Sequence, residues 1–260
     1  MPLFCCSFSA TGIKSGYRSD HRSESVLDEF SFTFRSGLVY VIMGPNGSGK
    51  STLLKTLVGQ MQPAFGSVLF QCSAGIHRAD LEYIPQDYRQ ALFPWKTVRG
   101  NVRPWRDSEE RFATGGDDQR PSVEQALEWV GLDPVKDRYV FELSGGQQQL
   151  VLIARCMVSS ANVLLLDEPF SAVDIVRRSR ISSHLRDVWR NQGNVVICAM
   201  HEPEEAVTLA DEVLIFHGPP FRLDSTVRRP AAAEDPAGPS LFRDLLLSGI
   251  QHVSKGDIHG

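Results

Sequence analysis

The sequence contains no long apolar segment, no excess of basic residues and no internal repeat, and each absence argues against one class of protein. No uninterrupted apolar run approaches the roughly 18 residues that a membrane-spanning helix requires, so any membrane role is expected to be peripheral. The formal net charge of −4 and a pI near 6.0 argue against binding to nucleic acid or anionic lipid through bulk charge. The lack of a fixed sequence period argues against solenoids and propellers.

Cysteine is also scarce, and its distribution bears on the cellular setting. The chain has an odd number of cysteines and no C-x-x-C pair, and the pattern favours a reducing, cytoplasmic setting. The five cysteines are Cys5, Cys6, Cys72, Cys156 and Cys198. No Lys or Arg precedes Lys14, so the charged start of a secretory signal peptide is missing. We interpret Cys5-Cys6 as an ordinary tail, with a lipidation site as the alternative.

The chain does contain short apolar runs that alternate with longer helical patterns. Apolar residues make up 42% and charged residues 22%, which is typical of a soluble protein with one large domain. The runs at 38–43, 163–166, 195–200 and 213–216 are rich in Val, Ile and Leu and show no polar alternation. Strands that are apolar on both faces are typical of a parallel sheet covered by helices, so the predicted fold class is α/β.

Composition shifts divide the chain into three parts. The stretch from Gln86 to Ser144 contains Trp, Pro and Arg, a Gly-Gly-Asp-Asp break at 115–118 and a short helical pattern at 122–130. We interpret residues of about 87–160 as a mainly helical lobe inserted in a domain of residues 1–225. Proline-rich points near Pro230 and at 237–239 predict a linker, and residues 241–253 predict an amphipathic helix that closes the tail of residues 226–260.

A phosphate-binding loop follows the first apolar run. Eight residues match G-x-x-x-x-G-K-[ST], namely Gly44, Pro45, Asn46, Gly47, Ser48, Gly49, Lys50 and Ser51. Its glycines allow successive N–H groups to form an anion site, and the helix that begins beside Thr52 adds its positive end, so Thr52 is grouped with the nucleotide-binding residues. Lys50 is predicted to neutralise the β- and γ-phosphates and Ser51 to hold Mg²⁺. The loop alone does not separate transporters from kinases, GTPases or motor proteins.

An acidic pair ends the apolar run at 163–166. Asp167 is predicted to lie at the carboxyl edge of the sheet, where ligands of open α/β folds bind, and to hold Mg²⁺ directly or through water. Glu168 is predicted to polarise an attacking water as a general base, which is what hydrolysis requires beyond binding. Taken alone, such a pair is often only a solvated turn, and its coupling to the phosphate-binding loop favours the catalytic interpretation.

A second glycine motif, Leu143-Ser144-Gly145-Gly146-Gln147, precedes this pair and begins a helical pattern. With it the chain resembles the ATP-binding cassette (ABC) family, whose signature motif is LSGGQ. The order of loop, signature and acidic strand makes the resemblance specific. It implies a P-loop NTPase (RecA-like) core with a mainly parallel sheet and an inserted helical subdomain. It also implies that Ser144, Gly145, Gly146 and Gln147 contact the nucleotide of a partner subunit.

Four further positions extend the resemblance over roughly residues 12–216. Gln86 aligns with the Q-loop glutamine, a contact of Mg²⁺ and of the attacking water. Asp174, in Ser171-Ala172-Val173-Asp174, aligns with the D-loop at the dimer seam. His201 resembles the switch histidine that contacts the γ-phosphate, and Tyr17 resembles the aromatic residue that stacks on adenine. Leu150 is a departure, because the family usually has Arg there, and a local ion pair is thereby put in doubt.

The resemblance implies an ATPase subunit that energises a membrane transporter. Residues 91–102, which include Phe93 and Trp95, resemble importer subunits for nitrate, sulfonate and taurine, and both aromatic residues are expected to be exposed permease contacts, with packing inside the lobe as the alternative. The implied cofactors are ATP and Mg²⁺. The implied partners are a second copy or a paired ABC subunit, transmembrane permease subunits and a solute-binding protein, with no nucleic acid. The chain itself is expected to be peripheral, at the cytoplasmic face of the cell membrane.

Two other functions stay open at this point. One is a soluble ABC-type ATPase that acts on a protein or nucleic-acid assembly, which would be active without a permease. The other is a regulatory nucleotide binder that does not hydrolyse ATP. The presence of Lys50, Glu168 and His201 argues against the second alternative.

Overall fold

The computed structural model describes residues 6–19, 22–72, 80–103, 120–230 and 240–256. Its centre is a six-stranded sheet in the order β5-β6-β7-β3-β8-β9, in which all pairings are parallel except that of β8 with β9. The strands are β3 (Leu38–Met43), β5 (Leu81–Ile84), β6 (Val163–Asp167), β7 (Val195–Met200), β8 (Glu212–His217) and β9 (Arg222–Arg228). The predicted mainly parallel α/β fold is therefore confirmed.

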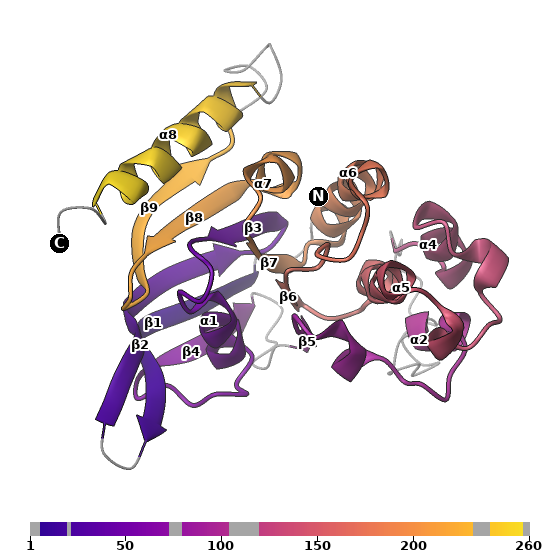
Figure 1. Ribbon diagram of the computed structural model, residues 1–260, viewed down its shortest axis with the longest axis horizontal. Helices are drawn as coiled ribbons and strands as arrows, with labels where there is room; N and C mark the ends of the chain where they lie inside the picture. The colour runs from indigo at the N-terminus through magenta and orange to yellow at the C-terminus, as the bar shows by residue number, and fades with distance from the viewer. Residues whose placement is uncertain (1–5, 20–21, 73–79, 104–119, 231–239, 257–260) are drawn as a thin grey trace.

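A second, antiparallel sheet in the order β2-β1-β4 lies against one face of the first sheet (Figure 1). Its strands are β1 (Cys6–Ser19), β2 (Arg22–Arg35) and β4 (Phe65–Cys72). Together with helix α1 (Lys50–Leu57) it covers that face, and aromatic side chains such as Phe30 and Phe34 fill the space between the two sheets. The apolar runs in the sequence did not indicate this sheet.

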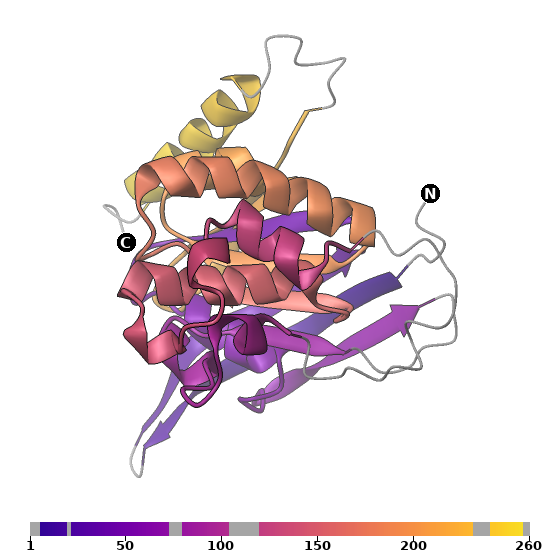
Figure 2. The ribbon, with the colours of Figure 1, turned by 90° about the vertical axis from the view of Figure 1, so that its right-hand side faces the viewer.

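Helices cover the opposite face. The core helices are α6 (Ile175–Gln192) and α7 (Pro203–Leu209), and α8 (Ser240–Gly256) packs on β8 and β9 (Figure 1). The inserted helical lobe contains α2 (Val98–Val102), α4 (Val123–Trp129) and α5 (Gly145–Val158), with short 3₁₀ turns at Tyr88–Ala91, Asp133–Val135 and Val140–Glu142. Figure 2 shows α6 above α5 and above the strands of the sheet.

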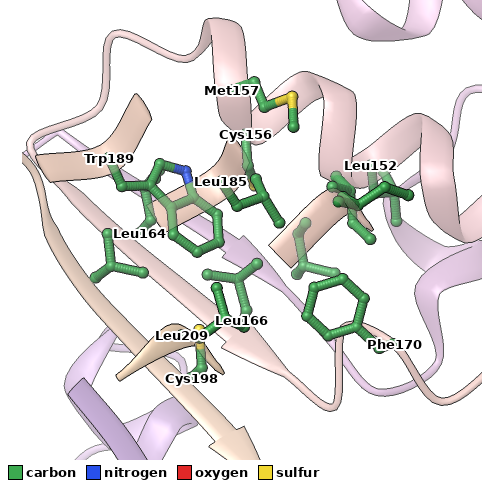
Figure 3. Packing of buried hydrophobic residues seen from close by; sticks show 14 of the residues in the cluster. Leu152, Cys156, Met157, Leu164, Leu166, Phe170, Leu185, Trp189, Cys198 and Leu209 are labelled. Carbon is green, nitrogen blue, oxygen red and sulfur yellow. The ribbon is translucent and has the colours of Figure 1, made fainter. Parts of the chain in front are cut away.

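Burial on both faces explains why the central strands are continuously apolar. In β3, Val39 and Val41 belong to the core on the helical side, whereas Tyr40 and Ile42 belong to the core beside α1. The larger core joins the lobe to the sheet, because α5 packs between β6 and the other lobe helices. Figure 3 shows part of it, including Leu152, Cys156, Met157, Leu164, Leu166, Phe170, Leu185, Trp189, Cys198 and Leu209.

Most of the predicted elements are present at nearly the predicted bounds. The strands at 38–43 and 195–200 match, those at 163–166 and 213–216 are longer by one residue and by one at each end, and the helix at 122–130 is α4 with its two caps. The helix at 241–253 is α8. The expected boundary after residue 225 falls within β9, which pairs with β8 as far as Arg228. The expected break at 115–118 and linker point at 237–239 lie outside the described residues.

Two sequence-based expectations concern the surroundings of the chain. Cys156 and Cys198 are free and buried, as expected for a reducing setting, but Cys6 is disulfide-bonded, so the expectation of reduced cysteines does not hold for that residue. In the part of the chain that the structure describes, no helix has the length and apolar character needed to span a membrane.

Candidate active site

The phosphate-binding loop joins the end of β3 to the start of α1. Gly47 and Gly49 have φ values of 73° and 125°, a region that other residues adopt only with strain. A Cβ atom on Gly49 would also lie 2.9 Å from Cγ1 of Val26 and 3.2 Å from Cβ of Phe221. The sequence therefore needs glycine at this point both for backbone conformation and for space.

Phe221 supports the loop from outside, and nothing in the sequence pointed to it. Its ring is fully buried and stacks on Phe216, with centroids 4.2 Å apart and an angle of 8° between the rings. Its backbone N–H donates to the carbonyl of Val26 at 2.7 Å. A Cβ atom on Gly44 would lie 3.1 Å from Cε2 of Phe221, so the ring bounds the loop at both of its ends.

Lys50 is held inside the loop. Its buried ammonium group donates to the carbonyls of Gly44 and Pro45, both at 2.9 Å. Burial lowers the pKa of Lys50, and the negative charges of Glu168 and Asp167 oppose that shift. Within the described residues this buried cation bonds to two neutral carbonyls of the loop, and it is suited to exchange them for an anionic ligand.

Asp167 ends β6 beside this loop, and its side chain is almost fully buried, at 2% exposure. Burial raises its pKa, an interaction with the Ser51 hydroxyl lowers it and the charge of Glu168 raises it further. Among the described residues, its Oδ2 atom and the Oγ atom of Ser48 are buried without a hydrogen-bond partner. A carboxylate oxygen left unsatisfied next to a hydroxyl suits Mg²⁺, which prefers oxygen ligands and takes few of them from the protein.

The structure describes no group of three or more His, Cys, Asp and Glu side chains that could hold a metal ion by themselves.

Glu168 is the centre of a second group of side chains. It has a positive φ of 51°, and its backbone N–H donates to the carbonyl of Ala199 at 3.0 Å, which fixes the chain where it leaves the sheet. Its carboxylate accepts a hydrogen bond from Nε2 of Gln86 at 3.4 Å and lies 3.7 Å from Nδ1 of His201. Gln86, Glu168 and His201 follow β5, β6 and β7, so three neighbouring parallel strands deliver these side chains to one sheet edge.

The second glycine motif lies at the start of α5, in the helical lobe. Ser144 caps the helix by accepting from the N–H of Gln147 at 3.4 Å, and the Gln147 side chain accepts from the N–H of Ser144 at 3.0 Å. A Cβ atom would lie 2.7 Å from the hydroxyl of Tyr88 at Gly145 and 2.5 Å from the carbonyl of Ala172 at Gly146. Figure 1 shows α5 separated from α1 by β5 and β6, so this motif and the phosphate-binding loop of the same chain are not brought together.

Gln149 is a second residue that the sequence did not single out. It is buried, and its Nε2 donates to the carbonyl of Glu168 at 3.1 Å and to Oγ of Ser171 at 3.2 Å. Its Oε1 accepts from the N–H of Ala172 at 2.8 Å. The first turns of α5 are therefore bonded to the segment that follows Glu168. The only sequence signal was its place within a glutamine run.

Three other expected positions have different outcomes. Asp174 caps α6, because its Oδ1 accepts from the N–H of Arg177 at 3.0 Å. Leu150 is buried in the core, so the family's usual arginine position here serves packing. The backbone of Tyr17 lies in β1 opposite Glu24, but its side chain is outside the described part of the structure, so its stacking role stays a prediction.

Comparison with known proteins identifies relatives over most of the chain. The family profile described as ABC transporter matches residues 27–171. A taurine import ATP-binding protein, TauB, from Jannaschia sp. is 32% identical over 212 residues, which cover 82% of this chain and 78% of the relative. An aliphatic sulfonates import ATP-binding protein, SsuB, from Bacillus cereus is 28% identical over 251 residues, 96% of this chain and 97% of the relative.

Solved structures agree on the fold. The dimeric structure of MJ0796, a bacterial ABC transporter cassette, superposes with a TM-score of 0.67 at 22% identity and covers 86% of this chain and 99% of that chain. A bacterial Atm1-family ABC exporter with ATP bound superposes with a TM-score of 0.65 at 26% identity and covers 85% of this chain and 39% of that chain. With its phosphate-binding loop, acidic strand end and signature motif, the chain belongs to the ABC transporter family.

Proposed function

We propose that this chain binds ATP with Mg²⁺, hydrolyses it and thereby energises a membrane importer of small solutes of the sulfonate and taurine class. The observation that carries the proposal is the convergence of Gln86, Glu168 and His201 at one sheet edge beside a loop that buries Lys50. The names of the two import ATP-binding relatives described above supply the direction of transport and the solute class.

The loop residues bind and orient the triphosphate. Lys50 exchanges its two carbonyl partners for phosphate oxygens, and the N–H groups between Gly44 and Thr52 provide the concave anion site. Ser51 and Asp167 would hold Mg²⁺, because Asp167 offers an unsatisfied buried oxygen and interacts with the Ser51 hydroxyl. Mg²⁺ held there would supply positive charge to offset the negative charge that develops on the phosphates during transfer.

Glu168 is the general base in this proposal. Its carboxylate takes a proton from the attacking water, and Gln86 and His201, which lie 3.4 Å and 3.7 Å from its oxygens, orient that water and the terminal phosphate. Gln86 would additionally help to hold Mg²⁺. The three side chains are brought together because β5, β6 and β7 are neighbours in the core sheet.

A second subunit completes the site. Ser144, Gly145 and Gly146 lie at the N-terminus of a helix of fourteen residues and are separated from their own chain's loop, so they are available to the nucleotide of a facing copy or a paired ABC subunit. The Gln147 amide caps the helix and supports the motif, with its side-chain oxygen engaged by the Ser144 N–H. Asp174 lies on the same seam, where it begins α6.

The helical lobe presents a surface for a membrane partner. Trp95 and Phe141 are 70% and 66% exposed, and each stacks or tilts against a neighbouring aromatic ring. The bridge between Thr97 and Tyr139 places the two pairs on adjacent segments. Phe93 was expected to be exposed, but it is half-buried, and the guanidinium of Arg155 lies 5.3 Å from the centre of its ring. Of the two aromatic residues expected to contact the permease, Trp95 is therefore the one that we propose. This chain meets transmembrane permease subunits at the cytoplasmic face of the membrane, and together with a solute-binding protein they complete the proposed importer.

The test compares Glu168→Gln with Glu202→Gln in the full-length chain. Both carboxylates lie 3.7 Å from a ring nitrogen of His201, but only Glu168 also bonds to Gln86. We expect the Glu168 variant to bind ATP, to accumulate as an ATP-bound dimer and to lose turnover by at least about 100-fold, and the Glu202 variant to keep it. Turnover in the Glu168 variant that equals that of the wild type would refute the assignment.

A further inference from the structure

A charged pair outside the site joins the two segments that carry Glu168 and His201. Arg178, in the first turns of α6, donates from Nη2 to the carbonyls of Phe170 and Val173 at 3.2 Å and 2.9 Å. Its Nη1 bonds to Oε1 of Glu205, which lies in the first turn of α7. One guanidinium group therefore contacts the loop after Glu168 and the helix after His201.

Glu205 is the acidic member of this pair, and its side chain is mostly buried. Burial raises the pKa of Glu205, and electrostatic interactions with Arg178 and His201 oppose that shift, so the carboxylate lies within electrostatic reach of both side chains. Its backbone N–H donates to the carbonyl of Glu202, which ties it to the turn directly after His201. The position of α7 relative to His201 is thereby fixed.

These contacts form a continuous path that begins at Glu168 and returns to the His201 segment. Glu168 approaches His201 to 3.7 Å, and the N–H of Ser171 donates to the carbonyl of Glu168 at 3.2 Å. The loop continues to Val173, whose carbonyl bonds to Arg178, and Arg178 returns through Glu205 to the His201 segment. Among the described residues, the bonds of Arg178 and Glu205 do not reach Lys50 or Ser51, so the pair acts through the segments it joins.

We propose that Arg178, through its bonds to Glu205 and to the carbonyls of Phe170 and Val173, is a positioning residue that sets the placement of Glu168 relative to His201. The inference rests on the hydrolytic function proposed above. A planar guanidinium is required, because three acceptors in different directions must be met at once. Lysine keeps the charge but presents one compact ammonium group and cannot reproduce this geometry.

The test is Arg178→Lys, with Arg186→Lys as a matched control. Arg186 lies two turns further along α6 and pairs with Asp211 at 2.8 Å, and the exposed fractions of the two pairs are similar, 22% and 10% against 21% and 11%. Of these two arginines, Arg178 is the one that contacts the loop after Glu168. We measure kcat, KM for ATP and the thermal unfolding midpoint of the full chain with Mg²⁺.

The expected result is a loss of kcat of about tenfold or more in Arg178→Lys with KM within about twofold of wild type, because misplaced groups at a reacting centre are costly while nucleotide binding is retained. Arg186→Lys should lower the unfolding midpoint about as much as Arg178→Lys does, and it should leave kcat close to wild type. Equal kcat values in the two variants would overturn the positioning role.

Glu205→Gln provides a second measurement if Arg178→Lys does not fold. The neutral amide weakens the pair on the α7 side, so kcat should fall in Glu205→Gln too. Where both single variants fold, the double variant should be no slower than the slower single variant, since both act through one contact. Independent, multiplicative losses would refute the shared role. A wild-type chain without turnover would refute the hydrolytic function itself, which separates the two failures.

Discussion

Replacing Gln149 with leucine tests whether the helical lobe holds the loop after Glu168. Leucine is similar in size and suits a buried position, so packing changes little, while three hydrogen bonds are lost. Two of these partners, Ser171 and Ala172, are exposed, and water replaces part of what they lose. The remaining partner is the carbonyl of Glu168, the residue that we assign as the general base.

The magnitude follows from the number and setting of these bonds. A protein hydrogen bond contributes about 0.5–1.5 kcal/mol net, so three bonds with partial replacement by water amount to about 2 kcal/mol of unfolding free energy. For a domain of this size, a loss of that magnitude lowers the unfolding midpoint by about 4–8 °C. Because the loop that follows Glu168 is released, kcat should fall by at least about tenfold.

The adjacent residue offers the control. Gln148 donates from Nε2 to the carbonyls of Val140 and Leu143, at 3.0 Å and 3.2 Å, and both partners belong to the lobe. Gln148→Leu should therefore lower stability by about 1 kcal/mol and leave kcat per folded molecule near wild type. The assays are urea unfolding and steady-state ATPase activity of each variant. Equal kcat losses in the two variants would show that the bonds of Gln149 have no special effect on Glu168.

Two further predictions concern burial at the site. Because the pKa of Asp167 is raised, its contribution to stability is present at low pH and is lost as pH rises through its folded pKa; Asp167→Asn should therefore raise the unfolding midpoint of the nucleotide-free chain at about pH 7.5, with a smaller gain at about pH 5, and abolish Mg²⁺-dependent turnover. A lower midpoint at pH 7.5 would contradict this. Phe221→Ala should cost about 3–5 kcal/mol and weaken ATP binding. Phe242→Ala, at an equally buried position in α8, should cost similar stability with nucleotide affinity unchanged in equilibrium binding.

The core sheet was predictable because its strands are buried on both faces and therefore appear in the sequence as continuous apolar runs. Strands such as β3 and β7 are apolar at every position, since neighbouring residues face two different cores. The antiparallel sheet leaves no such record. Strand β1 contains Ser, Thr, Lys and two glycines, and its pairing with β2 is interrupted by register shifts, so no regular period of two survives along it.

The candidate site divides in a similar way between local and distant contributions. Residues that act through short motifs were predictable, because Lys50, Asp167 and Glu168 each lie within a few positions of a strand end. Gln149 and Arg178 were not, because their contacts depend on how α5 and α6 pack against the loop after β6. Phe221 reaches the phosphate-binding loop from a position more than 170 residues away in sequence, which no local pattern records.

The same supporting contacts explain why the lobe and the core cannot move independently at this point. Gln149 bonds the start of α5 to Glu168, Ser171 and Ala172, and the signature glycine Gly146 lies so close to the carbonyl of Ala172 that no side chain fits between them. A displacement of α5 that preserves these contacts must carry the loop after Glu168 with it. Lys50 stays with the core, because its ammonium group is bonded to its own loop. The placement of the loop that follows Glu168 therefore depends on the position of the lobe, which is the part of the chain that presents the exposed aromatic surface.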